Sequence, residues 1–211
     1  IEHNRGHHVR VATPEDPATS RFGENFYSFW IRSVRDGFLS AWELEKKRLE
    51  KNGQAFWSLK NQMILFQVLP IAFAGLPFLV ISLLQNRMVW EVPLFFFGQS
   101  VLAFTLLEAV NYLEHYGMER NRLATGFYEK VTPLHSWNAS QSVSNLLLFQ
   151  LQRHYNHHAF AFKPYQVLNH YEDSPHLPAV YSAMIFVAFF PTLWFVIRNP
   201  SCNICEHSTL S

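Results

Sequence analysis

Seven of the eleven histidines in this chain lie in three short arrays whose spacing suits metal binding. The arrays are His3, His7 and His8; the single His115; and His154, His157 and His158. Residues three and four apart share one face of an α-helix, so the rings within the first and third arrays can converge. Neutral imidazole is the commonest metal ligand in proteins, and convergent imidazoles can hold a transition metal without thiolates. The sequence therefore predicts a metal site.

The number and type of these histidines limit which metals the site can hold. Seven imidazoles are more than one ion with open positions needs, so we expect two ions. The set is rich in nitrogen and lacks thiolates, which suits Fe, Zn, Cu or Mn without ranking them. The competing interpretation of the third array is a solvent-exposed basic patch. Three rings within one and a half turns would repel one another if protonated, which favours the metal site.

His115 stands alone and needs separate support, because a lone histidine at the end of an apolar helix is usually structural. Glu108, Asn111 and His115 follow one another at steps of three and four, which places them on one helical face. An ionisable side chain inside a membrane helix costs about 2.5 kcal/mol or more unless it faces partners or a wet cavity. A polar face that leads to His115 therefore favours a ligand role for this residue.

The composition indicates a membrane protein with a single domain over residues 1–211. Aromatic residues make up 16% of the chain, and charged residues fall to 16%, against about 25% in typical soluble domains. The mean hydropathy of −0.03 indicates that membrane and polar segments alternate. A net charge of +1 argues against a general attraction to nucleic acid. Two cysteines are too few for a disulfide scaffold.

Two charge-poor segments predict a transmembrane hairpin. Residues 62–84 contain no charge and would extend over about 35 Å as a helix, enough for a hydrocarbon core of about 30 Å. After a short turn, residues 88–113 form a second long apolar run. Lys and Arg are frequent before the first segment and after the second, so both ends are expected on the cytoplasmic side. All three histidine arrays would then lie on that side.

The remaining segments are predicted from periodicity and composition. Residues 11–25 contain prolines and polar residues and are interpreted as a surface loop. Residues 24–51 carry an apolar helical stripe, typical of a helix packed on a neighbour or lying on a bilayer. A helix is expected over residues 141–158. Residues 179–197 form a further apolar segment of marginal length for a span, and the C-terminal Cys202 and Cys205 are interpreted as a plain tail.

The histidine motifs resemble those of a known family. They are EHNRGHH at residues 2–8, NYLEHYG at 111–117 and LQRHYNHH at 151–158, and they are similar to the histidine boxes of integral-membrane alkane hydroxylases. Those enzymes are non-haem di-iron monooxygenases of the membrane desaturase and hydroxylase superfamily. Residues 12–20 also resemble the family's loop after its second box, and residues 178–185 loosely resemble a late segment. The resemblance implies an all-α integral-membrane bundle with a histidine-rich cytoplasmic region.

The resemblance also implies an activity and a set of site residues. The activity would be oxidation of the terminal methyl of a medium-to-long alkane to a primary alcohol, with O₂ and electrons from a rubredoxin-type partner, in the bacterial inner membrane. Two Fe ions would be bound by His3, His7, His8, His115, His154, His157 and His158. Residues expected to surround and orient these ligands are Glu2, Glu108, Asn111, Glu114, His135 and Asn156. His170 and His176 are interpreted as bystanders.

Two departures from the family pattern leave alternatives open. The family's first box, an H-E-x-x-H type pair, is absent from these residues, so we expect a C-terminal fragment that does not assemble a complete di-iron centre alone. Asn156 stands where the family has Asp, which removes a carboxylate beside an imidazole. The alternatives are a fatty-acyl desaturase or hydroxylase, an aromatic-methyl monooxygenase, and a non-catalytic metal-binding membrane protein.

Overall fold

The computed structural model describes residues 1–139, 154–159, 164–167 and 174–208. Helices dominate these residues, and their β pairing consists of the isolated bridges Arg122–Tyr128 and Asn138–His176. The all-α prediction is confirmed. In chain order the helical elements are η1 (His3–His7), α1 (His8–Arg10), α2 (Phe26–Lys51), α3 (Gln62–Gln85), α4 (Glu91–His115), η2 (Pro133–His135), α6 (His154–Ala159), η3 (Tyr165–Val167), α7 (Tyr181–Ala188) and α8 (Pro191–Ser208).

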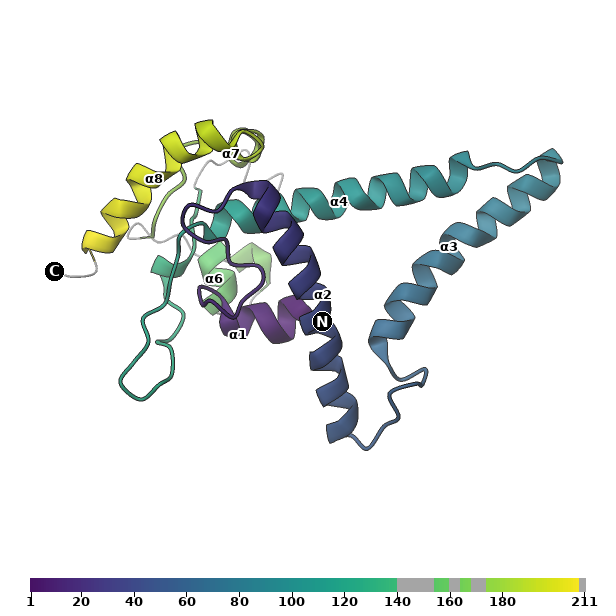
Figure 1. Ribbon diagram of the computed structural model, residues 1–211, viewed down its shortest axis with the longest axis horizontal. Coiled ribbons are helices and arrows are strands. Elements are labelled where there is room, and N and C mark those ends of the chain that lie inside the picture. The colour runs from purple at the N-terminus through teal and green to yellow at the C-terminus, as the bar shows by residue number, and fades with distance from the viewer. Residues whose placement is uncertain (140–153, 160–163, 168–173, 209–211) are drawn as a thin grey trace.

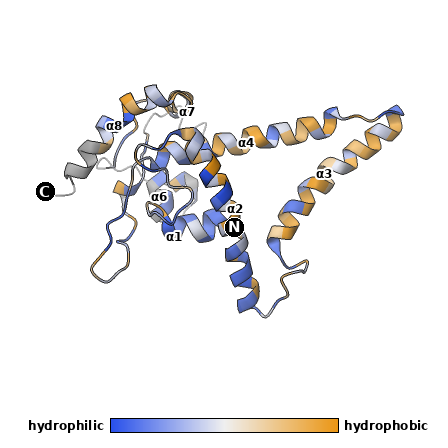
Figure 2. Cartoon of the chain, in the orientation of Figure 1, coloured by the Kyte–Doolittle hydropathy of each residue, from blue (hydrophilic) through white to orange (hydrophobic). Residues whose placement is uncertain are grey.

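Helices α3 and α4 extend together to one side of a folded body, and α2 crosses the base of this hairpin (Figure 1). Most of the hairpin is hydrophobic (Figure 2), and nearly all of its apolar surface is exposed. Both helices are long and apolar enough to cross a membrane. The predicted hairpin is confirmed, with spans that begin and end within three residues of those expected.

The last third of α4 has a different environment from the rest of the helix. Ala109 and the residues from Asn111 to His115 are buried in the body. The Tyr112 ring packs against Phe26 and Phe29 of α2 and against Trp194 of α8. This aromatic core fixes the direction in which the end of α4 enters the body, and it therefore places His115.

The segment at residues 11–25 is not the surface loop that was predicted. Its residues Val11, Ala12, Asp16 and Ser20 are buried. The Ser20 hydroxyl donates to the carbonyl of Tyr112 at 2.6 Å, and the backbone N–H of Gly117 donates to the Ser20 carbonyl at 3.0 Å. The segment lacks regular structure, but Ser20 ties it to the end of α4 and Asp16 and Thr19 bond to one another within it.

The C-terminal region also differs from the prediction. The apolar segment at residues 179–197 is divided into α7 and α8, which are separated at Phe189 and Phe190 just before Pro191. The interpretation of the cysteines as a plain tail is wrong for Cys202, which is buried beside Gly117 and the Tyr116 carbonyl. The side chain of Cys205, and residues 141–153 of the predicted helix at 141–158, lie outside the described part.

Glu45 connects three elements near the start of the hairpin. Its buried carboxylate accepts hydrogen bonds from Arg48 of α2 at 2.7 and 2.8 Å, from Arg5 of η1 at 3.1 Å, and from the backbone N–H of Gln62 at 2.7 Å. Hydrogen bonds from Arg48, Gln62 and Arg5 lower the pKa of Glu45 to about 2. The contribution of this carboxylate to stability is therefore full above its ordinary pKa and is lost as the pH falls toward 2.

We expect Glu45→Ala to destabilise the protein by about 2 kcal/mol or more, because it leaves buried donors without an acceptor. The thermal unfolding midpoint in detergent should fall by about 4 °C or more. Glu43→Ala is the matched control, because Glu43 pairs with Lys47 on the exposed face of the same helix and such pairs contribute about 0–1 kcal/mol. Equal midpoints for the two variants would contradict this role of Glu45.

Candidate metal centre

The seven histidines of the three arrays gather into two neighbouring groups. The buried group comprises His7, His115, His154 and His158, and the edge group comprises His3, His8 and His157. The ligand nitrogens of each group lie within 4.8 Å of one another. The groups adjoin, since the His8 and His158 ring centroids are 4.8 Å apart. The arrangement therefore offers two places for metal ions.

The first array does not use the α-helical spacing that the sequence suggested. Residues 3–7 form a π-helical turn, in which the N–H of His8 donates to the carbonyl of His3. A π-helical turn aligns residues five apart, so the Nε2 atoms of His3 and His8 lie 3.2 Å from one another. His7 points instead into the buried group. The α-helical spacing expected for the first array is therefore replaced by a π-helical one, and π-helical turns are frequent at functional sites.

The third array is also divided between the two groups. His154 and His158 are four residues apart on α6, and their Nε2 atoms lie 2.7 Å from one another. His157 is turned toward the edge group, where its ring centroid is 4.8 Å from that of His8. The segment formed by η1 and α1 contributes histidines to both groups, and so does α6. Helix α4 contributes only His115, to the buried group.

The nitrogens of the buried group fit a bound cation. The Nε2 atoms of His115 and His154 are 3.2 Å apart, and two nitrogens that bind one ion at about 2.1 Å lie about 3.0–3.4 Å apart. Nε2 of His7 is buried and has no hydrogen-bond partner among the described residues. Facing lone pairs on neutral rings are unfavourable without a positive charge between them. The residues present therefore fit a transition metal with nitrogen ligands.

Asp16 orients His7, and the sequence analysis did not identify it. Its carboxylate lies 2.8 Å from Nδ1 of His7 and also accepts from the Thr19 hydroxyl at 2.6 Å. A carboxylate on one imidazole nitrogen fixes the ring and directs the other nitrogen to the metal. Burial opposes ionisation of Asp16, but hydrogen bonds from His7 and Thr19 lower its pKa overall. The only sequence signal was an acidic residue in a loop next to the first array.

Glu114 is held against the buried group from the other side. Its Oε1 accepts from the Tyr181 hydroxyl at 2.7 Å, and its Oε2 lies 3.1 Å from Nε2 of His154. All of these side chains are buried. The carboxylate oxygen therefore points at the same nitrogen that faces His115 and His158. This position makes Glu114 a candidate fifth ligand and not only a residue that orients an imidazole.

The other residues expected around the ligands are placed differently. Glu2 bonds to Arg10 and Ser40, at 2.6 and 2.7 Å, so its described contacts are not with imidazoles. Glu108 accepts from the Ser33 hydroxyl of α2 at 2.6 Å and also hydrogen-bonds Asn111. These residues form a polar link between α2 and α4, one to two turns before His115.

His135 and Asn156 complete the set of expected residues. The His135 ring contacts Thr132 through Nδ1 and lies 3.3 Å from Glu129 through Nε2, while its backbone lies beside the His115 ring. The side chain of Asn156 lies outside the described part of the structure. His176, interpreted as a bystander, is exposed and paired through its backbone with Asn138, and His170 is outside the described residues.

Burial and crowding keep these imidazoles neutral. Burial first, and then the neighbouring histidines, lower the pKa of His3 and of His8 to about 4. The same causes lower the pKa of His154 and of His158 well below the ordinary value. Neutral rings are the form that binds metal, so the ligands are available at neutral pH. Without metal, the folded state loses stability as the pH falls below the ordinary histidine pKa toward 4, because the unfolded chain binds more protons there.

Comparison with known proteins identifies the family to which this chain belongs. The family model for fatty acid desaturases matches residues 1–188. The chain belongs to the fatty acid desaturase family. Within this family it is 48% identical to alkane 1-monooxygenase 2 of Pseudomonas aeruginosa, over 95% of this chain and 51% of that protein. The predicted resemblance to alkane hydroxylases is confirmed.

Two further relatives define the range of similarity. The chain is 45% identical to alkane 1-monooxygenase 2 of Alcanivorax borkumensis, over 95% of this chain and 50% of that protein. It is 26% identical to the hydroxylase component of the xylene/toluene monooxygenase of Pseudomonas putida, over 93% of this chain and 50% of that protein. The chain spans about half the length of the curated relatives that it matches.

We expect Asp16→Asn to weaken metal binding about 10- to 100-fold in the full-length protein, because Asn keeps the shape but not the charge that orients His7. Competition with a chelator, followed by measurement of bound metal, gives the change in affinity. Glu15→Gln is the matched control, because Glu15 is the exposed neighbour and contacts Tyr128. An unchanged affinity in Asp16→Asn would show that this carboxylate does not support the site.

Proposed function

We propose that this chain forms part of a membrane-bound non-haem di-iron monooxygenase that hydroxylates the terminal methyl of medium-to-long alkanes. The observation that carries the proposal is the pair of adjoining histidine groups at the base of an apolar hairpin. The relatives also support the proposal, because this chain is 41–48% identical to proteins named alkane 1-monooxygenase. The seven histidines of the two groups would be iron ligands, with His3, His8 and His157 on one ion and the other four on the second.

The ligand set suits oxygen chemistry on an unactivated C–H bond. Two irons bound here would supply the capacity to activate O₂ for insertion of an oxygen atom into such a bond. The protein's own part is to keep the imidazoles neutral, to hold them by Asp16 and by the Tyr181–Glu114 pair, and to exclude water from the buried group. Exclusion of water limits loss of oxidant to side reactions.

The apolar hairpin favours a substrate that is dissolved in the lipid. An alkane partitions into the hydrocarbon core, and the exposed faces of α3 and α4 carry aromatic and aliphatic side chains such as Phe73, Phe95 and Phe97. A site at the end of α4 can receive this substrate without passage through water. Glu108 and Asn111, between the apolar part of α4 and His115, would lie beside that route and mark where it becomes polar.

Electrons would be delivered from the side opposite the hairpin. His3 is exposed, so the edge group is closer to solvent than the buried group. We propose a rubredoxin-type donor that approaches there, with the histidine groups on the cytoplasmic side of the bacterial inner membrane. The Lys and Arg residues before α3 and after α4 support this orientation, because positive residues favour the cytoplasmic face.

The similarity to the xylene/toluene monooxygenase component favours aromatic methyl groups as a second substrate class. The reaction type would be the same, since a methyl C–H bond is hydroxylated in either case. The competing function as a fatty-acyl desaturase is represented by the family model. These three functions differ in their products and can be separated by one set of assays.

The full-length protein, supplied with Fe²⁺, O₂, rubredoxin, its reductase and a reduced nicotinamide cofactor as the source of two electrons per turnover, should convert n-octane to 1-octanol. Gas chromatography compares this product with those from p-xylene and palmitoyl-CoA. His154→Ala should lower turnover at least about 100-fold, since it removes a buried ligand, whereas His176→Ala replaces an exposed histidine outside both groups and should not. Turnover of p-xylene or the acyl substrate alone would overturn the alkane assignment.

The iron content of variants that lack one histidine should distinguish the two histidine groups. We expect about two irons per chain in the full-length protein, and about one in both His157→Ala and His158→Ala, because each removes a ligand from a different group. Elemental analysis gives the count. Chelator should strip the remaining iron faster from His158→Ala, in which the intact group is the exposed edge group. Loss of both irons in either variant would contradict two separable sites.

A further inference from the structure

Helix α2 and the segment that follows it carry an apolar surface that the metal centre does not use. Tyr27, Ile31 and Phe38 are exposed on α2, and their spacing of four and seven residues places them on one helical face. Trp42 continues this face by four residues. The buried residues Phe29 and Ser33 lie on the other side of this part of the helix. A helix that is apolar on two sides has a second partner to contact.

The segment between α2 and α3 extends this surface. Trp57 and Leu59 are each 82% exposed, only a few residues before α3 begins at Gln62. Lys60 lies between them and the start of the helix. Tryptophan together with lysine at the end of a membrane span is typical of the interface between hydrocarbon and headgroups.

The position of α2 makes this surface continuous with the hairpin. The Trp30 indole donates to the Thr105 hydroxyl of α4 at 3.1 Å and its ring stacks on Phe104. Figure 1 shows α2 crossing the base of the hairpin and α3 starting beside its lower end. If α3 and α4 cross a bilayer, α2 runs along the surface of that bilayer. Its exposed apolar face then continues the lipid-facing surface of the two spans.

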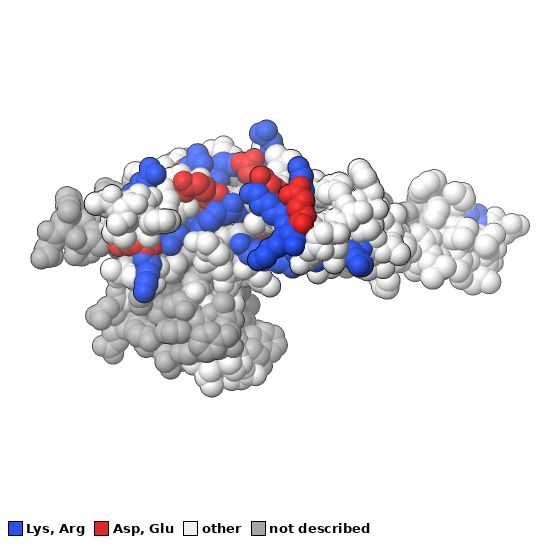
Figure 3. Space-filling view, turned by 90° about the horizontal axis from the view of Figure 1, so that it is seen from below, with Lys and Arg blue, Asp and Glu red and all other residues white. Residues whose placement is uncertain are grey.

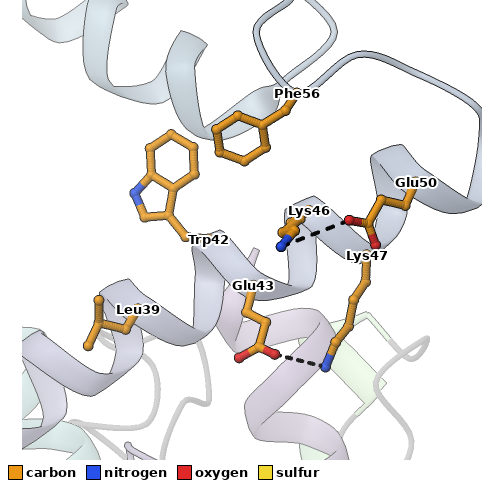
Figure 4. Close-up of a pocket in the computed structure, with 7 residues that line it drawn as sticks. All are labelled: Leu39, Trp42, Glu43, Lys46, Lys47, Glu50 and Phe56. Atoms are coloured by element: carbon orange, nitrogen blue, oxygen red, sulfur yellow. Dashed lines mark ion pairs between the residues drawn. The ribbon is translucent and has the colours of Figure 1, made fainter.

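A pocket beside this face has the chemistry of a lipid site. It is open, has a volume of about 380 Å³, and lies between α2 and Phe56. Figure 4 shows the rings of Trp42 and Phe56 side by side in its lining, with centroids 5.6 Å apart. Lys46 and Lys47 stand at its rim in exposed ion pairs with Glu50 and Glu43, at 4.0 and 3.3 Å. Such exposed pairs are weak, so a phosphate can replace the glutamates.

Charge distribution agrees with this assignment. Figure 3 shows Lys and Arg gathered over the body together with some Asp and Glu, while the hairpin is almost free of charge. The pocket itself is lined by Lys46 and Lys47 together with their partners Glu50 and Glu43, and Lys51 and Lys60 are further exposed cations of α2 and the segment after it. Basic residues at the membrane surface attract anionic headgroups.

We propose that α2 and residues 52–61 form an interfacial anchor that binds an anionic phospholipid of the membrane crossed by α3 and α4. The acyl chains contact Trp42 and Phe56, and the headgroup phosphate contacts Lys46 and Lys47. Trp57 and Leu59 insert among neighbouring headgroups. The anchor requires only that the hairpin is in a membrane, so it stands whichever reaction the metal centre performs.

Photo-crosslinking in nanodiscs tests what covers this surface. The full-length protein carries p-benzoylphenylalanine in place of either Trp57 or Phe127, in discs of mixed phosphatidylcholine and phosphatidylglycerol. Phe127 is the matched control because it is also an exposed aromatic residue, at 75%, in the loop after α4, which projects away from the hairpin (Figure 1). We expect phospholipid adducts by mass spectrometry at position 57 and at least about 10-fold fewer at position 127. Peptide adducts at position 57, from this protein or a second copy, would overturn the proposal, as would equal lipid labelling at both positions.

Lipid selectivity tests the pocket itself. The double variant Lys46→Glu, Lys47→Glu should retain at least about 3-fold less phosphatidylglycerol after purification than the unmodified protein, because the phosphate contacts become repulsive. Lys130→Glu makes the same kind of charge change in the loop after α4 and should retain the normal amount. Lys46→Gln, Lys47→Gln provides the milder change if the first variant folds poorly. Equal retention by the lysine-pair variants and the Lys130 control would exclude the pocket as the site.

Discussion

The central constraint on this fold is the confinement of seven imidazoles in two adjoining groups. Burial and the neighbouring histidines lower the pKa of His154 and of His158 well below the ordinary value, so these rings are held in the neutral form. Neutral rings in turn direct lone pairs toward one another, which is unfavourable without a cation. The site is therefore stable only when the surrounding elements hold the rings firmly, and the structure supplies buried carboxylates at Asp16 and Glu114 to do so.

Helix α4 joins the membrane and the site because its two ends have different environments. Its first two thirds expose apolar side chains, and its last third is buried among α2, α7 and α8. The change occurs near Glu108, whose carboxylate bonds Ser33 of α2. A charged or polar group at this level would be costly in lipid, but here it has protein partners. The polar face that the sequence revealed is thus a boundary between the lipid-exposed helix and the metal centre.

The sequence predicted the elements better than it predicted their contacts. The hairpin and α2 followed from long apolar runs and from helical periodicity, signals that tertiary contacts do not alter. The division of the histidines could not be predicted in this way, because it depends on a π-helical turn that aligns His3 with His8. Asp16 and Tyr181 were missed for a related reason, since each reaches the site from a segment distant in sequence or without periodicity. The expectation of two ions from seven imidazoles stays a prediction, and the two histidine groups are compatible with it.

The way in which the two groups share elements makes them interdependent. The first array gives His7 to the buried group and His3 and His8 to the edge group, while α6 gives His154 and His158 to the former and His157 to the latter. A shift of either element therefore disturbs both groups at once. His115 is the one histidine of these groups that comes from α4, the element anchored in the aromatic core around Tyr112. The rigid core thus fixes one ring, and the other six depend on how two short helical segments dock against it. This explains why carboxylate contacts from Asp16 and Glu114 are concentrated on the buried group, where the core and both segments meet.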